Sequence, residues 1–196
     1  MTFLDRAKKR TFDLAVSALG LFCLWPVIVV TAILAKRDTG ASGIFKQQRI
    51  GRNGKMFQVF KIRTMRPVEG TTVTTKNDSR ITPLGTKLRR WKLDELPQLL
   101  NVLVGDMSFV GPRPDVPGFL DRLQGPEREL LQLRPGITGP ATIKYRNEEE
   151  ILANDDDPET YNAEVIWPDK VKINLDYMHN WSFRADLGYI MDTVFK

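Results

Sequence analysis

The 196-residue sequence predicts a helix-rich α+β fold, with a re-entrant (helix-break-helix) membrane hairpin, interfacial amphipathic helices and a short β-hairpin around a cytosolic core. An uncharged segment of membrane-spanning length follows the N-terminus, and stretches with helical spacing of apolar residues occupy much of the remaining chain. Asn53-Gly54 is a strong signal for a β-hairpin turn. We therefore divide the chain into a membrane-embedded re-entrant helix, residues 1–38, and a cytosolic domain, residues 39–196, which rests on the membrane as one folding unit.

The composition indicates an anionic partner and narrows the possible chemistry. Lys and Arg total 29 against 24 Asp and Glu, which gives a net charge of +5. This balance favours nucleic acid, anionic lipid or phosphorylated substrates. Cys23 is the only cysteine and His179 the only histidine, which excludes a disulfide framework, a thiolate metal site and a His-rich zinc site. Acid–base chemistry must therefore come from carboxylates, Lys or Tyr.

The segment from Leu14 to Ala35 contains no charged residue. As a straight helix it would be roughly 33 Å long, which is enough to cross the hydrocarbon core of a bilayer. Lys36 and Arg37 follow it, where a signal peptide would have a small-residue cleavage site. The sequence therefore predicts a membrane-bound protein.

Basic residues flank this segment on both sides, and these are Arg6, Lys8, Lys9, Arg10, Lys36, Arg37 and Lys46. Because such residues favour the cytoplasmic side, both ends of the segment are expected there. A helix that bends at Trp25-Pro26 and leaves by the face it entered satisfies both flanks, since Pro26 removes one helical hydrogen bond. The residues alone leave open the alternative of a kinked transmembrane helix.

Residues 44–65 predict the β-hairpin. Apolar and polar residues alternate from Met56 to Met65, as in a half-buried strand. On that strand Lys61 and Arg63 share the polar face, where they either line a site or are merely solvated. Residues 67–80 are rich in Thr, Lys, Asn, Asp and Ser and predict a surface loop.

A helix is predicted from Thr82 through Arg90, and its cations are expected near anionic headgroups or a lipid phosphate. Residues 116–133 predict an amphipathic helix with a Gly-Pro interruption. Residues 134–140 predict a rigid turn that either grips a phosphate or nucleoside or serves the fold alone.

The last two segments are an acidic stretch and a tail. The acidic residues 147–158 lack the Gly and terminal Glu of an EF-hand loop and predict a solvated helix and loop. Residues 169–196 contain two amphipathic stretches, which either lie in the membrane interface or pack on the core.

The most informative segment, Trp91 to Pro114, contains two adjacent acids. If a helix starts at Lys92 or Leu93, these acids lie in its first turn. There the macrodipole lowers the pKa values of Asp94 and Glu95 and keeps both ionised. An ionised Asp can act as a nucleophile toward phosphorus, and two carboxylates suit a Mg²⁺ ion whose other ligands are water and substrate phosphates.

Arg113 lies between two prolines and could clamp a phosphate bidentately. The alternative interpretation is that Asp94 and Glu95 supply only favourable charge at a helix N-terminus. The residues of this segment alone leave both interpretations open.

The same segment resembles a known family. L-D-E-L-P-Q-L-L-N-V-L-V-G-D-M-S-F-V-G-P-R-P, from Leu93 to Pro114, closely resembles the signature of the bacterial sugar transferases, in the form of the small monotopic phosphoglycosyl transferases. Further matches are F-K-I-R-T-M (Phe60 to Met65), R-P-G-I-T-G (Arg134 to Gly139) and the basic N-terminus with its proline-broken apolar helix. Together the motifs cover most of the chain from Lys8 to Arg146.

The resemblance implies an enzyme that transfers a phosphosugar from a UDP-sugar to polyprenol (undecaprenyl) phosphate and releases UMP, the first membrane step of bacterial glycoconjugate synthesis. It implies a re-entrant helix in the bacterial inner membrane, with residues 39–196 as the catalytic domain on the cytoplasmic face. The implied mechanism is ping-pong: Asp94 attacks the β-phosphate, and the lipid phosphate then displaces the covalent phosphosugar. Glu95 orients or deprotonates the lipid phosphate, and Mg²⁺ is held by Asp94 and the diphosphate.

The resemblance also implies substrate-binding positions. Arg89 falls where the family binds the lipid phosphate, Arg113 where it contacts substrate phosphate, and Lys61 at a basic position near the acidic pair. The remaining candidates for substrate binding are Arg63, Arg134, Gly136, Thr138 and Arg146.

The chain departs from the family pattern at three places. Lys92 replaces a small hydroxyl residue, Trp25 replaces a small polar one, and residues 142–147 differ near the expected nucleotide-sugar pocket. The identity of the sugar is therefore not transferred.

The competing interpretation is a non-catalytic, basic amphipathic protein of the membrane surface. No nucleic-acid partner is expected, because the apolar segment does not fit one, and homodimerisation is left open.

Overall fold

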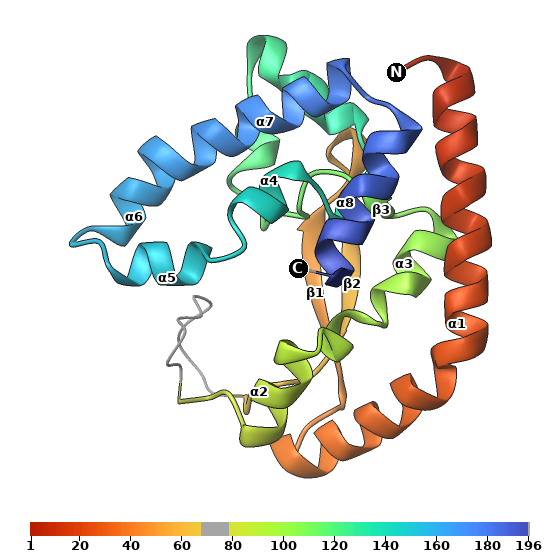
Figure 1. Cartoon of the computed structure of the whole chain (residues 1–196). Helices are drawn as coiled ribbons and strands as arrows, with labels where there is room; N and C mark the ends of the chain where they lie inside the picture. The colour runs from red at the N-terminus through yellow and green to blue at the C-terminus, as the bar shows by residue number, and fades with distance from the viewer. Residues whose placement is uncertain (68–78, 196) are drawn as a thin grey trace.

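The computed structural model describes residues 1–67 and 79–195 (Figure 1). In chain order its helices and strands are α1 (Phe3–Thr39), β1 (Ile44–Ile50), β2 (Met56–Ile62), α2 (Pro83–Arg90), α3 (Gln98–Val104), β3 (Ser108–Val110), β4 (Gly136–Thr138), α4 (Pro140–Lys144), α5 (Glu148–Ala153), α6 (Pro158–Tyr161), α7 (Trp167–His179) and α8 (Phe183–Phe195). Short 3-10 helices occupy Arg52–Gly54, Leu93–Glu95, Leu120–Arg122 and Gly125–Gln132, and a π-helical turn, Asn162–Ile166, joins α6 to α7. The predicted helix-rich α+β class is confirmed, whereas most of the predicted loop, residues 68–78, lies outside the described residues.

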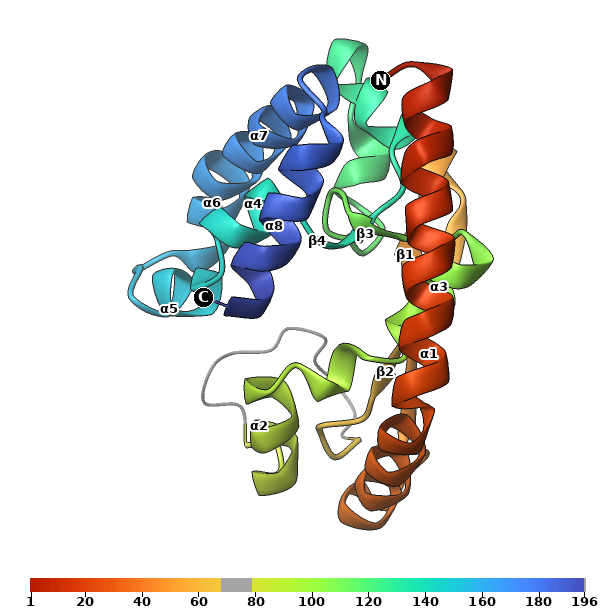
Figure 2. The ribbon, with the colours of Figure 1, turned by 45° about the vertical axis from the view of Figure 1, so that its right-hand side comes forward.

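The N-terminal helix α1 is 37 residues long and is capped at both ends. Thr2 and Asp5 form a capping box at its start, and Gly40 ends it in the left-handed conformation (φ 71°). Pro26 lies inside the helix, which stays continuous but changes direction in its C-terminal part (Figures 1 and 2). The structure therefore has one bent helix in place of two helices separated by a break, because a long helix accommodates a single lost hydrogen bond by bending.

The surface of α1 has an inverted distribution of polar and apolar side chains. The residues buried against the protein are mostly polar or small, and these are Asp13, Ser17, Thr31, Ala35 and Thr39. Its exposed large apolar residues between the basic flanks are Leu14, Val16, Leu19, Phe22, Trp25, Val27, Val29, Val30, Ile33 and Leu34. Only 11% of its most apolar 18-residue window is buried. Because a helix of a water-soluble protein has the reverse pattern, this surface indicates association with a membrane.

The predicted β-hairpin is confirmed. β1 and β2 are antiparallel, with Ile44 opposite Ile62 and Ile50 opposite Met56. Asn53 (φ 59°) and Gly54 (φ 74°) both adopt the left-handed conformation that such a turn requires. β2 ends at Ile62, three residues earlier than the predicted strand.

The second sheet is a short parallel pair. In it Ser108 of β3 lies opposite Gly136 of β4, and Val110 lies opposite Thr138. The backbones approach so closely that a Cβ on Gly136 would lie 2.2 Å from the Gly111 nitrogen. The predicted turn over residues 134–140 is thus corrected to a strand over 136–138, because parallel pairing with a distant segment leaves no local pattern in the sequence.

Residues 116–133 also differ from the prediction of one amphipathic helix. The structure has two 3-10 helices there, and the second begins at a glycine with positive φ (Gly125, 56°) that Pro126 follows. This pair of residues prevents a continuous α-helix. The apolar side chains of the segment, including Leu130 (1% exposed), still join the core.

The C-terminal part is helical, as predicted. α7 and α8 correspond to the two amphipathic stretches, and both pack partly on the core through Tyr177 and Asp186. The acidic segment forms α5, a short loop and the start of α6. The predicted helix after Thr82 is α2, and the Thr82 hydroxyl caps it by accepting from the Gly85 N–H (2.9 Å).

Candidate active site

Asp94 and Glu95 lie in a tight turn between α2 and α3. Lys92 precedes them in the left-handed conformation (φ 55°) and makes no side-chain cap. A 3-10 helix then covers Leu93–Glu95, and α3 begins only at Gln98. The predicted helix start at Lys92 or Leu93 is therefore too early, because a left-handed residue without a capping side chain does not open an α-helix.

A buried amide fixes this turn to the strand that carries Lys61. Asn101 of α3 is fully buried and donates from Nδ2 to the Gln58 carbonyl (2.7 Å). Its Oδ1 accepts from the Phe60 N–H (3.1 Å). The Gln58 carbonyl and the Phe60 N–H both belong to β2, the strand that carries Lys61. Asn101 therefore sets the position of Lys61 relative to the acidic pair.

Helix α1 holds the other side of α3. The Arg10 guanidinium donates to the carbonyl oxygens of Val102 (2.6 Å) and Leu103 (2.8 Å) near the C-terminal end of α3, where a cation is favourable. Gly20 allows close packing, since a Cβ there would lie 3.2 Å from the Leu99 side chain. The acidic turn is therefore fixed relative to the apolar helix.

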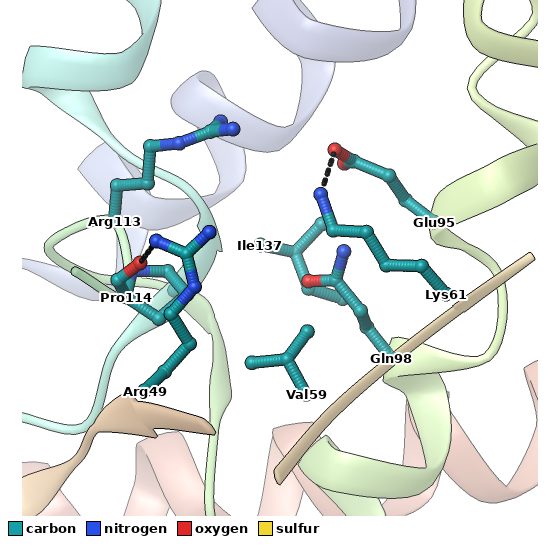
Figure 3. A pocket seen from close by; sticks show the side chains of 9 residues that line it. Arg49, Val59, Lys61, Glu95, Gln98, Arg113, Pro114 and Ile137 are labelled. Carbon is teal, nitrogen blue, oxygen red and sulfur yellow. Dashed lines mark hydrogen bonds and ion pairs between the residues drawn. The ribbon is translucent and has the colours of Figure 1, made fainter. Parts of the chain in front are cut away.

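Glu95 forms an ion pair with Lys61, with 3.2 Å between Nζ and Oε1 (Figure 3). Burial opposes its ionisation, yet the charges of Lys61, Arg113 and Lys92 hold the pKa of Glu95 below its usual value. Burial also lowers the pKa of the Lys61 amine, while Glu95 acts in the opposite direction. Glu95 is thus an ionised carboxylate in a poorly solvated position.

The pKa of Asp94 is shifted in the opposite direction to that of Glu95. Asp94 is 8% exposed, and its Oδ1 is buried without a hydrogen-bond partner among residues 1–67 and 79–195. Burial, and then the adjacent charge of Glu95, raise the pKa of Asp94 against the opposing effect of Lys61 and Arg89. The expectation that the macrodipole lowers both pKa values is wrong for Asp94, because burial outweighs it. A buried carboxylate oxygen without a donor calls for an explanation, and a ligand supplies one.

Glu95 opens onto a pocket whose lining residues are Arg49, Val59, Lys61, Glu95, Gln98, Arg113, Pro114, Gly136 and Ile137 (Figure 3). Arg113 lies across the pocket from Lys61 and Glu95. Arg49 of β1 donates to the Pro114 carbonyl (3.1 Å). Two guanidinium groups and an amine thus face one ionised carboxylate, an arrangement that suits a polyanionic ligand. Asp94 itself is not among the lining residues.

Arg49 and Gln98 line the pocket, although neither was predicted from the sequence to lie in the site. Gln98 stands within the matched signature, directly after Pro97, so its place in that motif was an available signal. Arg49 had no such signal, because only the pairing of β1 with β2 brings it near the pocket.

Two predicted residues, Arg89 and Arg63, do not line the pocket. The Arg89 side chain of α2 donates from Nε to the Thr64 hydroxyl (3.0 Å) and lies close enough to Asp94 to lower the pKa of its carboxyl. Arg63 donates to the Ser42 carbonyl (2.7 Å) and lies over the Phe45 ring, 5.3 Å from its centroid. Arg63 therefore does not share the surroundings of Lys61.

Of the four candidates in and after the R-P-G-I-T-G motif, only Gly136 lines the pocket. Arg134 donates to the Gly105 carbonyl (2.8 Å) and lines a second cavity. The Thr138 hydroxyl is hydrogen-bonded to that of Thr193 (2.5 Å), which joins β4 to α8. Arg146 is exposed and donates to the backbone of α8 (3.4 Å).

Mg²⁺ fits the acidic turn. Asp94 Oδ1 is a carboxylate oxygen without a partner, and Glu95 adjoins it. Within residues 1–67 and 79–195, no group of three His, Cys, Asp or Glu could hold a metal. Mg²⁺ does not require one, because it commonly binds through one or two carboxylates and completes its shell with water and substrate phosphates.

Comparison with known proteins gives a consistent result. A family model described as "Bacterial sugar transferase" matches residues 4–196. The UDP-glucose:undecaprenyl-phosphate glucose-1-phosphate transferase of Escherichia coli (strain K12) is 35% identical over 203 residues, covering 98% of this chain and 40% of that protein. The uncharacterized sugar transferase EpsL of Bacillus subtilis (strain 168) is 36% identical, covering 96% of this chain and 86% of that protein. The exopolysaccharide production protein PSS of Rhizobium leguminosarum bv. phaseoli is 37% identical, covering 97% and 95%.

Proposed function

This protein belongs to the bacterial sugar transferase family, and we propose that it transfers a phosphosugar from a UDP-sugar to polyprenol (undecaprenyl) phosphate, giving polyprenyl-diphosphate-sugar and UMP. The observation that carries the proposal is the acidic turn, in which Asp94 has a buried, unpartnered oxygen beside the Glu95–Lys61 ion pair. The printed name of the Escherichia coli relative, a UDP-glucose:undecaprenyl-phosphate glucose-1-phosphate transferase, supports the same substrate classes.

The proposed first step forms a covalent intermediate. A carboxylate oxygen of Asp94 attacks the phosphorus that carries the sugar, and the bond from this phosphorus to the bridging oxygen breaks. UMP leaves with that oxygen and its electron pair, and Asp94 becomes an aspartyl phosphosugar. Among the described residues Oδ1 of Asp94 has no hydrogen-bond donor, so the attack would break no hydrogen bond to this oxygen.

The proposed second step regenerates the enzyme. A phosphate oxygen of polyprenol phosphate attacks the same phosphorus, the acyl-phosphate bond breaks and the Asp94 carboxylate is released. Glu95, ionised in the resting site, accepts a proton from the lipid phosphate if one is present. Arg89, on the α2 side of Asp94, would bind this lipid phosphate, since it is a cation near the acidic turn.

The cations of the pocket would bind the diphosphate. Arg113 and Arg49 lie on one side and Lys61 on the other, so a bound diphosphate would have positive charge on both sides. Bound at Asp94 and the substrate phosphates, Mg²⁺ would neutralise phosphate charge and so let an anionic nucleophile approach. Gly136 borders the pocket with backbone atoms alone, and a glycine is required there because a Cβ would lie 2.2 Å from the Gly111 nitrogen.

The location that we propose is the cytoplasmic face of the bacterial inner membrane, with α1 as a re-entrant element. The exposed apolar residues of α1 need a lipid environment, and both flanks of its apolar segment are basic. Cysteines placed at positions 5 and 40, in a variant whose Cys23 is replaced, should both react only with a reagent added from the cytoplasmic side. Reaction from opposite sides would instead establish a transmembrane helix.

The activity is tested by incubating detergent-solubilised protein with Mg²⁺, polyprenol phosphate and each member of a panel of UDP-sugars. We expect UMP release with at least one sugar, dependent on both substrates for multiple turnovers. No UMP with any sugar would contradict the proposal and favour the non-catalytic membrane-surface protein.

A further inference from the structure

A second cavity, beside the first turns of α1, shares no lining residue with the candidate active site. Four cationic side chains from three separate parts of the chain line it. They are Arg6 and Lys9 of α1, Arg52 of the hairpin turn and Arg134 of the segment before β4. Asp13 is the one carboxylate among the lining residues. The cavity therefore has an excess of positive charge.

Most of this positive charge is not neutralised by ion pairs. Lys9 forms an ion pair with Asp186 (2.5 Å), so the charge of Lys9 is neutralised within the fold. Arg6 donates to the Gln132 amide oxygen (3.3 Å) and Arg134 to the Gly105 carbonyl (2.8 Å), and both acceptors are neutral. These bonds position the guanidinium groups and leave their charges available to a ligand.

Arg52 points to a missing acceptor. Its Nε is buried and has no hydrogen-bond partner within the part of the chain that the structure describes. A buried charged donor without an acceptor is costly, so such groups are rare in folded proteins. Burial, and then the nearby charges of Arg10 and Arg52, lower the pKa of Arg134, while Asp13 acts in the opposite direction. An anion in the cavity would relieve both costs.

We propose that this cavity is a binding site for a phosphate group, separate from the site of sugar transfer. The planar guanidinium groups of Arg6, Arg52 and Arg134 approach from different segments, and a tetrahedral phosphate has oxygens directed toward several donors at once. The phosphate could belong to a lipid headgroup, because α1 carries the exposed apolar surface, or to a free ion in solution. A bound phosphate would join α1, the hairpin turn and the segment before β4.

The variant that tests the site is Arg52→Gln, which removes the unpartnered donor. Lys55→Gln is the matched control, because Lys55 follows the same turn, is exposed and does not line the cavity. Arg113→Gln serves as the second control, since it weakens phosphate binding in the candidate active site only. Arg6→Gln, at an exposed position, is a second test variant in case Arg52→Gln does not fold.

The measurement is made on the full chain in detergent by calorimetric titration with inorganic phosphate, and on vesicles of phosphatidylcholine with and without phosphatidylglycerol by flotation. We expect Arg52→Gln to weaken binding of at least one probe by about ten- to a hundredfold, as for loss of a charged hydrogen bond. Lys55→Gln should bind both probes as the wild type does, and Arg113→Gln should retain the binding that Arg52→Gln loses. An effect confined to inorganic phosphate indicates a free ion, and one confined to the anionic vesicles indicates a lipid headgroup.

Equal binding by wild type, Arg52→Gln and Arg6→Gln for both probes would overturn the proposal. Loss of all phosphate binding in Arg113→Gln would overturn it as well, because the phosphate would then occupy the candidate active site. Neither outcome depends on UMP release, so the proposal fails or survives independently of the proposed transferase activity.

Discussion

Asp94 and Asp186 are both buried carboxylates beside cations, but their hydrogen bonding differs. Asp186 is 2% exposed and accepts from Lys9 Nζ (2.5 Å), the Tyr177 hydroxyl (2.7 Å) and Trp181 Nε1 (3.0 Å). Asp94 is 8% exposed and has an oxygen that no donor in the described part of the chain reaches. The first carboxylate is fully satisfied by the fold, whereas the second is not.

This difference separates a structural carboxylate from a functional one more clearly than burial or charge alone. A satisfied buried ion pair joins segments of the fold, here α1 with α7 and α8. An unsatisfied carboxylate lowers stability, and such groups with perturbed pKa values concentrate at functional sites. Each of the predictions below tests one side of this contrast.

The largest expected effect is on activity in Asp94→Asn. We expect UMP release to fall by about 10⁴-fold or more, as for loss of a catalytic nucleophile. Because the pKa of Asp94 is raised in the folded protein, its neutral form stabilises the fold. This stabilisation is present below the pKa of Asp94 in the unfolded chain and is lost as the pH rises through its pKa in the folded protein. At neutral pH the variant should therefore unfold at the same temperature as the wild type or higher. Asp156→Asn, at an exposed position, is the control.

Asp186→Asn should show the converse behaviour. Loss of the charge leaves Lys9 buried without its partner, and we expect the free energy of unfolding to fall by about 3–5 kcal/mol. Denaturant titration measures this change. The folded fraction should retain wild-type turnover, and selective loss of turnover at unchanged stability would show that Asp186 acts in the reaction.

Lys61→Met removes the ion-pair partner of Glu95. The pKa of Glu95 is lowered in the wild type, so its stabilising charge is present above the unfolded pKa and lost as the pH falls through the folded one. In the variant this pKa should rise, which would move the acid limb of the kcat/KM profile to higher pH and reduce activity by about 10²-fold. A profile that keeps its wild-type midpoint would show that Lys61 does not set the charge of Glu95.

The smallest expected effect is in Asn101→Leu. The substitution leaves the Phe60 N–H and the Gln58 carbonyl without their partner, and we expect a loss of about 1–3 kcal/mol in the free energy of unfolding. Activity per folded molecule should also fall, because Asn101 sets the position of Lys61 relative to the acidic turn. Unchanged kcat in the folded protein would show that β2 is positioned without it.

Features with a local physical cause were predictable from the sequence. The turn at Asn53-Gly54 follows from two residues that tolerate positive φ, and α2 follows from Thr82 at its N-cap. The apolar length of α1 predicted membrane association, and the matched motif predicted the acidic pair.

Features that depend on tertiary contacts were not predictable. Burial along α3 does not follow from residue type, because Leu100 is 42% exposed, while the polar Asn101 is fully buried by its bonds to β2. Arg49 reaches the pocket through strand pairing, and Arg134 lines a different cavity from the one expected. Apart from Arg49, which the local hairpin positions, these residues are placed by contacts between segments that are distant in the sequence.

The most direct test of the central claim is the intact mass of the protein after incubation with its UDP-sugar and Mg²⁺ in the absence of polyprenol phosphate. If Asp94 is the nucleophile, the mass of the wild type increases by one phosphosugar and about one equivalent of UMP is released. Addition of polyprenol phosphate then restores the original mass, and Asp94→Asn shows no increase. An adduct that forms equally on Asp94→Asn, or a wild type that turns over rapidly without ever carrying one, would contradict the assignment.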